Sequence, residues 1–240
     1  MTKLGERIVG LDGLRQDGVV RWALPRVAAI SVLVGLYFAF IFAETEATMG
    51  DVQRIFYFHV ASAWIAFLAF FVVFVTSIAY LRTRNWQWDS IACSAAEIGT
   101  VFTTVALISG SIWAKKAWGA YWTWDPRLTT TLILWLIYIS YLVLRRMVET
   151  PQQRAAFSSV LGIIGFVDVP IVFLSIRLWR TIHPVLISQE GMDMTGRMGA
   201  AMGVAVIAFT LVFATLVVIR VSLERRRVEL DAVKAHLGLY

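Results

Sequence analysis

The sequence predicts an all-α integral membrane protein with six transmembrane helices. Two observations carry this prediction: 59% of the 240 residues are hydrophobic, and several apolar runs approach about 20 residues in length. A helix rises about 1.5 Å per residue, so runs of this length can cross a hydrocarbon core of about 30 Å. The expected helices cover residues 23–43, 56–81, 91–112, 128–144, 157–176 and 200–219.

Local signals support the first three helices in turn. The first run is longer than the core of a signal peptide and follows a polar segment, so we expect it to be retained as a helix. The second and third runs are separated by the short polar connection 82–90. The third holds the only cysteine, Cys93, which permits neither an internal disulfide nor a Cys-based metal cluster. We expect Cys93 to act as a small packing residue.

Turn and cap residues delimit the other three helices. Asp125 is a preferred N-cap and Pro126 suits the first helical position, so the fourth helix should begin there. Pro151 breaks the connection between the fourth and fifth helices. Within the fifth, Pro170 predicts a kink, beside which Asp168 is expected to satisfy a freed backbone group. The sixth helix follows the long connection 177–199.

Positive charge is unevenly distributed between the connecting segments. With the N-terminus inside, 15 of the 22 Lys and Arg residues fall in inner segments and 7 in outer ones. Cytoplasmic loops carry the excess of Lys and Arg, so we expect both termini in the cytoplasm. The chain is then a single membrane domain, with a cytoplasmic segment at 1–22, a six-helix bundle at 23–220 and a cytoplasmic tail at 221–240.

The composition also excludes several function classes. The net charge of +6 reflects the inside bias rather than a basic soluble face, so no nucleic-acid partner is expected. No nucleophile or acid–base pair stands out, which argues against an enzyme. The sequence contains no G-x-x-x-x-G-K-[ST] phosphate loop, so any ATP hydrolysis would come from a partner.

The most informative segment lies between the third and fourth predicted helices, in an outer loop. Residues 118–127 read Trp-Gly-Ala-Tyr-Trp-Thr-Trp-Asp-Pro-Arg. One Trp at the membrane surface would be an ordinary interfacial anchor. Three Trp and a Tyr so close together favour a platform for a flat aromatic ligand. The candidate platform residues are Trp118, Gly119, Trp122, Trp124 and Asp125.

Two histidines should lie on the same outer surface as this platform. His59 is at the outer start of the second predicted helix, and His183 is in the last outer loop, whereas His236 lies in the tail. Neutral imidazole is a common axial ligand of haem iron. Arg127, next to the platform, can pair with a haem propionate. We therefore expect a shallow haem site, which loses haem as the imidazoles protonate around a pKa of about 6.5.

Residues 118–125 match the W-G-x-x-W-x-W-D signature of haem-handling membrane proteins. The six-helix length, the paired outer histidines, and the stretches at 127–129 and 180–183 complete the match. Over nearly its whole length the chain resembles the CcmC family, the haem exporter protein C of cytochrome c maturation system I.

This resemblance implies more than the residue pattern does. It implies that haem b is bound at the outer face of the cell (inner) membrane, with His59 and His183 as axial ligands. Trp118, Gly119, Trp122, Trp124 and Asp125 would then form the surface for haem and for its acceptor. That acceptor would be the haem chaperone CcmE, which captures haem covalently. The ATPase CcmA, with the membrane partners CcmB and CcmD, would release the loaded chaperone.

Three alternatives remain open. System II cytochrome c synthase subunits share the tryptophan signature, but they are usually longer and carry additional histidines. A b-type cytochrome of a quinone oxidoreductase would normally place ligands at two depths, whereas both candidate histidines are at one surface. A permease would leave the histidines unexplained and reduce the aromatic segment to an interfacial belt. Glu97 and Asp168, the intramembrane acids, are functional candidates without an assigned role.

Overall fold

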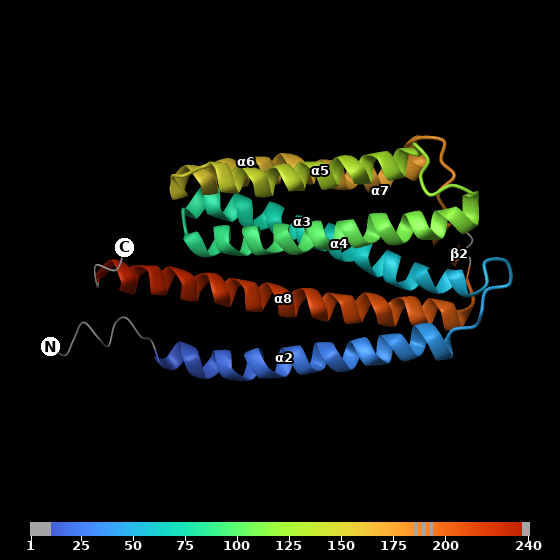
Figure 1. The fold of residues 1–240 in the computed structure, drawn as a ribbon, viewed down its shortest axis with the longest axis horizontal. Helices are drawn as coiled ribbons and strands as arrows, with labels where there is room; N and C mark the ends of the chain where they lie inside the picture. The colour runs from blue at the N-terminus through green and yellow to red at the C-terminus, as the bar shows by residue number, and fades with distance from the viewer. Residues whose placement is uncertain (1–10, 185–186, 189–190, 193, 237–240) are drawn as a thin grey trace.

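Long helices lie side by side along one axis in the computed structural model, which describes residues 11–184, 187–188, 191–192 and 194–236 (Figure 1). Part of the predicted cytoplasmic segment at 1–22 and the end of the predicted tail lie outside these ranges. The helices are α2 (Leu11–Tyr37), α3 (Ile55–Thr83), α4 (Trp86–Trp118), α5 (Pro126–Met147), α6 (Pro151–Phe166), α7 (Asp168–Leu178) and α8 (Gly196–His236). Shorter elements are the π-helical turn η1 (Phe38–Phe42), the 3-10 turn η2 (Asp51–Arg54), and the strands β1 (Ile187–Ser188) and β2 (Gly191–Met192), which pair antiparallel.

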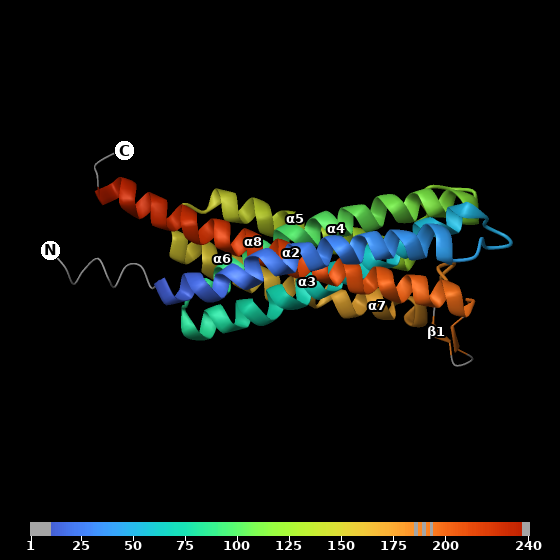
Figure 2. The same cartoon turned by 90° about the horizontal axis from the view of Figure 1, so that it is seen from below.

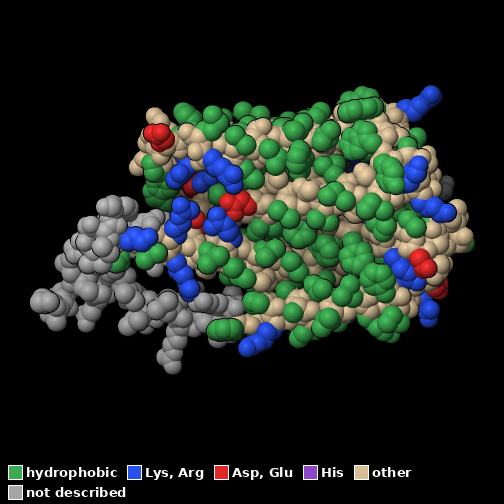
Figure 3. All heavy atoms as spheres, in the orientation of Figure 1, with side chains coloured by type: hydrophobic (Ala, Val, Ile, Leu, Met, Phe, Trp, Pro, Cys, Tyr) green, Lys and Arg blue, Asp and Glu red, His purple; other side chains and the backbone are tan. Residues whose placement is uncertain are grey.

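Six helical segments of the described chain are long and apolar enough to cross a membrane. Each predicted span overlaps one of them, which confirms the predicted number of spanning helices. On the face shown in Figure 3, an apolar middle is flanked by charged side chains toward both ends. A hydrocarbon layer requires this distribution, because charged groups are costly at its centre.

The two ends of the bundle differ in what they carry. The start of α2, the end of α8 and the short turns 84–85 and 148–150 lie at one end, the terminal end (Figures 1 and 2). The longer segments 43–54, 119–125 and 179–184, with the strands β1 and β2, lie at the other, the loop end. The candidate site residues of the sequence therefore come together at the loop end.

Several helices extend beyond their predicted apolar cores. α4 continues to Trp118, so this residue belongs to the helix and not to the loop. Gly119 then ends the helix with a φ of 77°, a left-handed conformation that glycine adopts without strain. α8 likewise continues through much of the predicted tail, as far as His236. Backbone hydrogen bonds extend a helix beyond its apolar residues until a capping residue such as Gly119 ends it.

The fifth span is broken, as Pro170 predicts. α6 ends at Phe166 and α7 begins at Asp168, with the Val167 N–H donating to the Ile164 carbonyl (3.1 Å) in a tightened turn. Pro170 has no N–H to donate to the Phe166 carbonyl. The expectation for Asp168 is not met in full, because its buried Oδ2 has no hydrogen-bond partner among the described residues.

α3 is the central helix, and it packs against α4, α6 and α8, while α2 lies on the outside against α8 (Figure 1). The core is built mainly from aliphatic and aromatic side chains of α3, α4 and α5, with further buried residues from α7 and α8. Phe70 and Tyr138 stack there with ring centroids 3.5 Å apart. α3 and α4 approach each other closely at Gly99, where an added Cβ would lie 2.8 Å from the Cβ of Ala69.

Two ion pairs join helices toward the terminal end. Arg145 of α5 donates two hydrogen bonds to Asp89 of α4, at 2.6 and 2.9 Å. Arg220 of α8 donates two to Glu97 of α4, at 2.7 and 3.1 Å. Glu97, a functional candidate from the sequence, thus forms an ion pair with Arg220 that joins α4 to α8.

Candidate functional site

A large cavity lies between α3, α4, α5, α7 and α8 toward the loop end. Its volume is about 350 Å³, and most of its lining is apolar. Five of the predicted site residues line it: His59, Trp118, Trp122, Arg127 and His183. The sequence separates them widely, and the antiparallel packing of the helices brings them together.

The cavity reaches deep into the bundle. Its lining includes Phe67, Thr103, Leu134 and Val172. Thr103 is about 22 Å along α4 from Trp118, at about 1.5 Å of rise per residue. The site is therefore not the shallow platform that the sequence suggests. Two small residues of α4, Ala106 and Gly110, line the cavity and leave room beside the helix for the His59 ring.

His59 is held by the backbone of the neighbouring helix. Its Nδ1 lies 2.9 Å from the carbonyl oxygen of Ala106 and 3.3 Å from Oγ of Ser109. A carbonyl only accepts hydrogen bonds, so the proton is assigned to Nδ1. The lone pair then remains on Nε2. Histidines that bind metals commonly donate their other N–H to a backbone carbonyl in this way.

His183 lies in the segment after α7 and lines the cavity at the loop end. Its Nδ1 is 3.4 Å from Nη1 of Arg127 and 3.2 Å from the Pro184 carbonyl oxygen. Its ring meets the Trp118 ring edge-on, with centroids 6.1 Å apart. Burial lowers the pKa of His183 to about 4, and the positive charge of Arg127 acts in the same direction. The imidazole is therefore neutral at neutral pH, the form that binds iron.

Asp125 connects the tryptophan segment to the His183 segment. One carboxylate oxygen accepts from the Arg127 N–H (2.9 Å), which is the N-cap that the sequence predicts. The other accepts from the Thr181 hydroxyl (2.6 Å) and the Ile182 N–H (3.0 Å). The Thr181 oxygen in turn accepts from the His183 N–H (3.0 Å). Asp125 is only 7% exposed and is not among the lining residues of the cavity.

The aromatic residues of the signature divide into two groups. Trp118 and Trp122 line the cavity. Trp124 and Tyr121 are 76% and 60% exposed, so they face the surroundings of the loop end. Gly119, predicted as a platform residue, is the left-handed C-cap of α4 and does not line the cavity.

Arg127 brings an available positive charge to the cavity. None of the ion pairs in the described part of the chain includes Arg127. Its side chain lines the cavity and touches a neutral imidazole, His183. A partly buried cation of this kind is stabilised by an anionic group on a ligand. The cavity thus suits an apolar, planar ligand that carries carboxylates and a metal.

Four residues at this site were not found from the sequence. Thr181 and the backbone of Ala106 orient the two histidines, and Gly110 lies against His59. Trp113 lines the cavity and donates to Oε1 of Gln53 at 3.1 Å. Trp113 carried a signal, since it lies five residues before the signature, and Thr181 falls in the stretch 180–183 that completes the family match. Ala106 and Gly110 are common residue types whose contacts with His59 are distant in the sequence.

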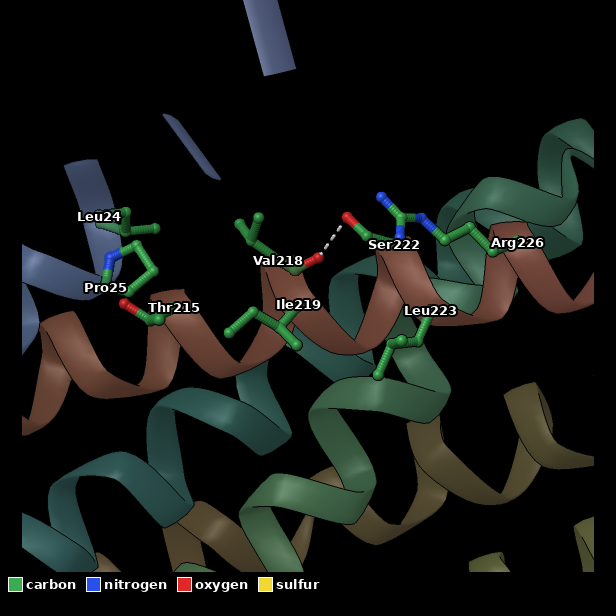
Figure 4. A pocket seen from close by; sticks show the side chains of 8 residues that line it. All are labelled: Leu24, Pro25, Thr215, Val218, Ile219, Ser222, Leu223 and Arg226. Atoms are coloured by element: carbon green, nitrogen blue, oxygen red, sulfur yellow. Dashed lines mark hydrogen bonds between the residues drawn. The ribbon is translucent and has the colours of Figure 1, made fainter. Parts of the chain in front are cut away.

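A second, small pocket lies between α2 and α8, in the half of the bundle toward the terminal end (Figure 4). Its volume is about 70 Å³, and its walls are mostly aliphatic. The Ser222 hydroxyl at its edge donates to the Val218 carbonyl (2.8 Å) of its own helix. The pocket holds no histidine and is too small for a macrocyclic ligand.

Six candidate spans and a cavity lined by two histidines indicate a multi-pass membrane protein with a site for a ligand. Comparison with known proteins agrees, because the model of the CcmC family, Heme exporter protein C, matches residues 14–235. The chain belongs to this family, which is one of haem-handling transport proteins and not of enzymes.

Individual relatives match over most of their length. The chain is 38% identical to the Heme exporter protein C of Bradyrhizobium diazoefficiens over 215 residues, covering 85% of this chain and 80% of the relative. It is 33% identical to that of Paracoccus denitrificans, covering 92% and 93%. It is 30% identical to that of Escherichia coli strain K12, covering 86% and 87%. In each comparison the match covers at least 80% of this chain and of the relative.

Proposed function

We propose that this protein binds haem b in the cavity at the loop end and delivers it to a haem chaperone of the CcmE type for cytochrome c maturation. The observation that carries the proposal is the pair of histidines. His59 and His183 come from different parts of the chain, line one apolar cavity, and each has its Nδ1 in contact with protein atoms. With the Nδ1–H of His59 on the Ala106 carbonyl and that of His183 on the Pro184 carbonyl, both Nε2 lone pairs are available for the axial positions of haem iron.

The remaining residues have complementary roles in this proposal. Trp118 and Trp122 supply flat apolar walls, whose burial against haem contributes about 25 cal/mol per Å². Arg127 pairs with a propionate. Trp124 and Tyr121 are exposed beside the cavity, in position to contact the chaperone. Delivery requires the ligand to leave. His183 lies on a non-helical segment whereas His59 is part of a helix, so we place the release of His183 before that of His59.

The proposed orientation places the loop end on the outer face of the cell (inner) membrane. Lys and Arg concentrate in the segments of the terminal end, which supports a cytoplasmic location for residues 1–22 and 221–240. The bundle at 23–220 is then one membrane domain. A CcmA-like ATPase would act from the cytoplasm, with CcmB-like and CcmD-like subunits beside the bundle in the membrane.

The test is an absorption spectrum of the detergent-purified chain, oxidised and reduced, after expression with ample haem. We expect a Soret band that shifts or disappears in His59→Ala and in His183→Ala. His236→Ala is the matched control, because this histidine lies in the predicted cytoplasmic tail, and its spectrum should equal that of the wild type. A wild type without haem, or a double His59→Ala/His183→Ala variant with an unchanged spectrum, would contradict the proposal.

Delivery is tested separately from binding. Haem-loaded chain is mixed with a purified CcmE-type chaperone, and transfer is followed by the absorbance of the separated proteins. We expect haem to move to the chaperone. A haem that stays bound and instead cycles rapidly with a quinol would identify the b-type cytochrome alternative.

A further inference from the structure

His59 lies directly against the backbone of α4 at Gly110. A Cβ built on Gly110 would be 2.7 Å from Cε1 and 3.1 Å from Nδ1 of His59. Real Cβ atoms essentially never come within 3.0 Å of a heavy atom from another part of the structure. The imidazole therefore occupies the volume that any other residue at position 110 would fill.

This close approach allows the hydrogen bond that orients the ring. Ala106 and Gly110 are four residues apart on α4, so they lie one above the other on the same face. The ring rests on Gly110 while its Nδ1 reaches the Ala106 carbonyl oxygen at 2.9 Å. That carbonyl has two lone pairs, so it can accept from the helix backbone and from the imidazole together.

We propose that Gly110 is a positioning residue for haem ligation. It forms a slot in α4 that holds His59 with its Nδ1–H on Ala106 and its Nε2 free for haem iron. The inference rests on the proposed function, since it assigns how one of the two proposed ligands is oriented. Gly110 touches His59 and acts through it.

The slot has two physical consequences. The ring is oriented before haem arrives, so binding costs little side-chain entropy at this ligand. The carbonyl bond also raises the basicity of Nε2, and loss of such a partner typically weakens metal binding by 10- to 100-fold. His59, seated between two helices, is thus the fixed ligand of the pair.

The first experiment compares Gly110→Ala with two matched glycine variants in the full-length purified chain. Gly203→Ala makes the same change in a helix where an added Cβ meets nothing within 4 Å. Gly99→Ala forces a similar clash between α3 and α4, with an added Cβ 2.8 Å from Ala69 and Phe70 atoms, at a distance from His59. Haem affinity is measured by titration, and axial ligation by the electron paramagnetic resonance of the oxidised form.

We expect Gly110→Ala to weaken haem binding by about 10- to 100-fold and to alter the electron paramagnetic resonance signal of low-spin haem iron. Gly203→Ala should match the wild type in both, and folded Gly99→Ala should keep the wild-type signal. Gly110→Ala with wild-type affinity and signal would overturn the inference. The same altered signal in Gly99→Ala would overturn it too, because general helix separation would then explain the effect.

A second experiment needs no haem and remains informative if Gly110→Ala folds poorly. The melting temperature of the haem-free chain is measured for Gly110→Ala, His59→Ala and the double variant. We expect Gly110→Ala to lower the melting temperature in the wild-type background but not in the His59→Ala background, where the ring is gone. Equal destabilisation in both backgrounds would overturn the inference. If instead the wild type binds no haem, the proposed function fails while this coupling still holds.

Discussion

His183 shows how burial changes the chemistry of a single residue. An exposed histidine would protonate near pH 6.5, and the sequence offers no reason to expect otherwise. In the structure, burial beside Arg127 lowers the pKa of His183 to about 4. Protons and haem iron compete for the same imidazole lone pair, so this shift extends ligation to lower pH.

We therefore expect haem occupancy to stay constant from pH 7.5 to about 5 and to fall as the pH approaches about 4. The unfolded chain takes up a proton at this histidine below about pH 6.5, whereas the folded chain does so only near pH 4. The free energy of unfolding therefore also declines as the pH falls from about 6.5 to about 4. Soret absorbance and far-ultraviolet circular dichroism, recorded together, separate ligand loss from unfolding. Haem loss centred near pH 6.5 in folded protein would contradict the buried position of His183.

Arg127 is a residue whose role depends on the charge of the ligand. We expect Arg127→Ala to weaken binding of haem by about 10-fold or more, because a charge-assisted hydrogen bond contributes about 1.5–3 kcal/mol. The dimethyl ester of haem, which lacks the propionate charges, should bind equally to both proteins. Arg180→Ala, an exposed cation of the same end, is the control. An equal loss for haem and for its ester would assign Arg127 to packing instead of propionate binding.

At the scale of elements, the ion pairs of α4 differ in burial. The Asp89 and Arg145 side chains are 10% and 13% exposed, whereas those of Glu97 and Arg220 are 36% and 34% exposed. Removal of one partner of a buried pair leaves an unpaired charge, which costs about 3–5 kcal/mol. Pairs that water reaches contribute about 0–1 kcal/mol, and we expect water to reach the partly exposed Glu97–Arg220 pair toward the terminal end of the bundle.

We accordingly expect Asp89→Ala to lower the thermal stability of the purified protein far more than Glu97→Ala does. The cavity lies toward the other end of the bundle, so folded Asp89→Ala should bind haem with wild-type affinity. Thermal unfolding and haem titration measure the two effects. Equal stability losses in the two variants would show that both pairs are solvated to the same degree.

The elements also show where the sequence was sufficient. The apolar runs predict the six spanning segments because hydrocarbon imposes a minimum length on each one. Pro170 and the Asp125-Pro126 pair mark a helix break and a helix start by local chemistry alone. The true end of α4 was missed, since Trp118 continues the helix as far as the cap at Gly119.

At the scale of the whole molecule, the sequence by itself determined the class of protein, the number of spanning helices and the family. It also pointed to the two histidines and to Arg127. These properties follow from composition, apolar length and short contiguous motifs, which need no knowledge of packing. The signature residues 118–127 are contiguous, whereas His59 and His183 were recognised because each lies at the end of an apolar run.

Only the tertiary structure decided the form of the site. It showed a deep cavity instead of a surface platform, separated Trp118 and Trp122 from Trp124, and turned Asp125 toward Thr181 and Ile182. It also brought Gly110 and Ala106 of α4 against His59 of α3. The physical reason is that burial, backbone hydrogen bonds and steric room arise between helices, where partners are distant in the chain and have no pattern along it.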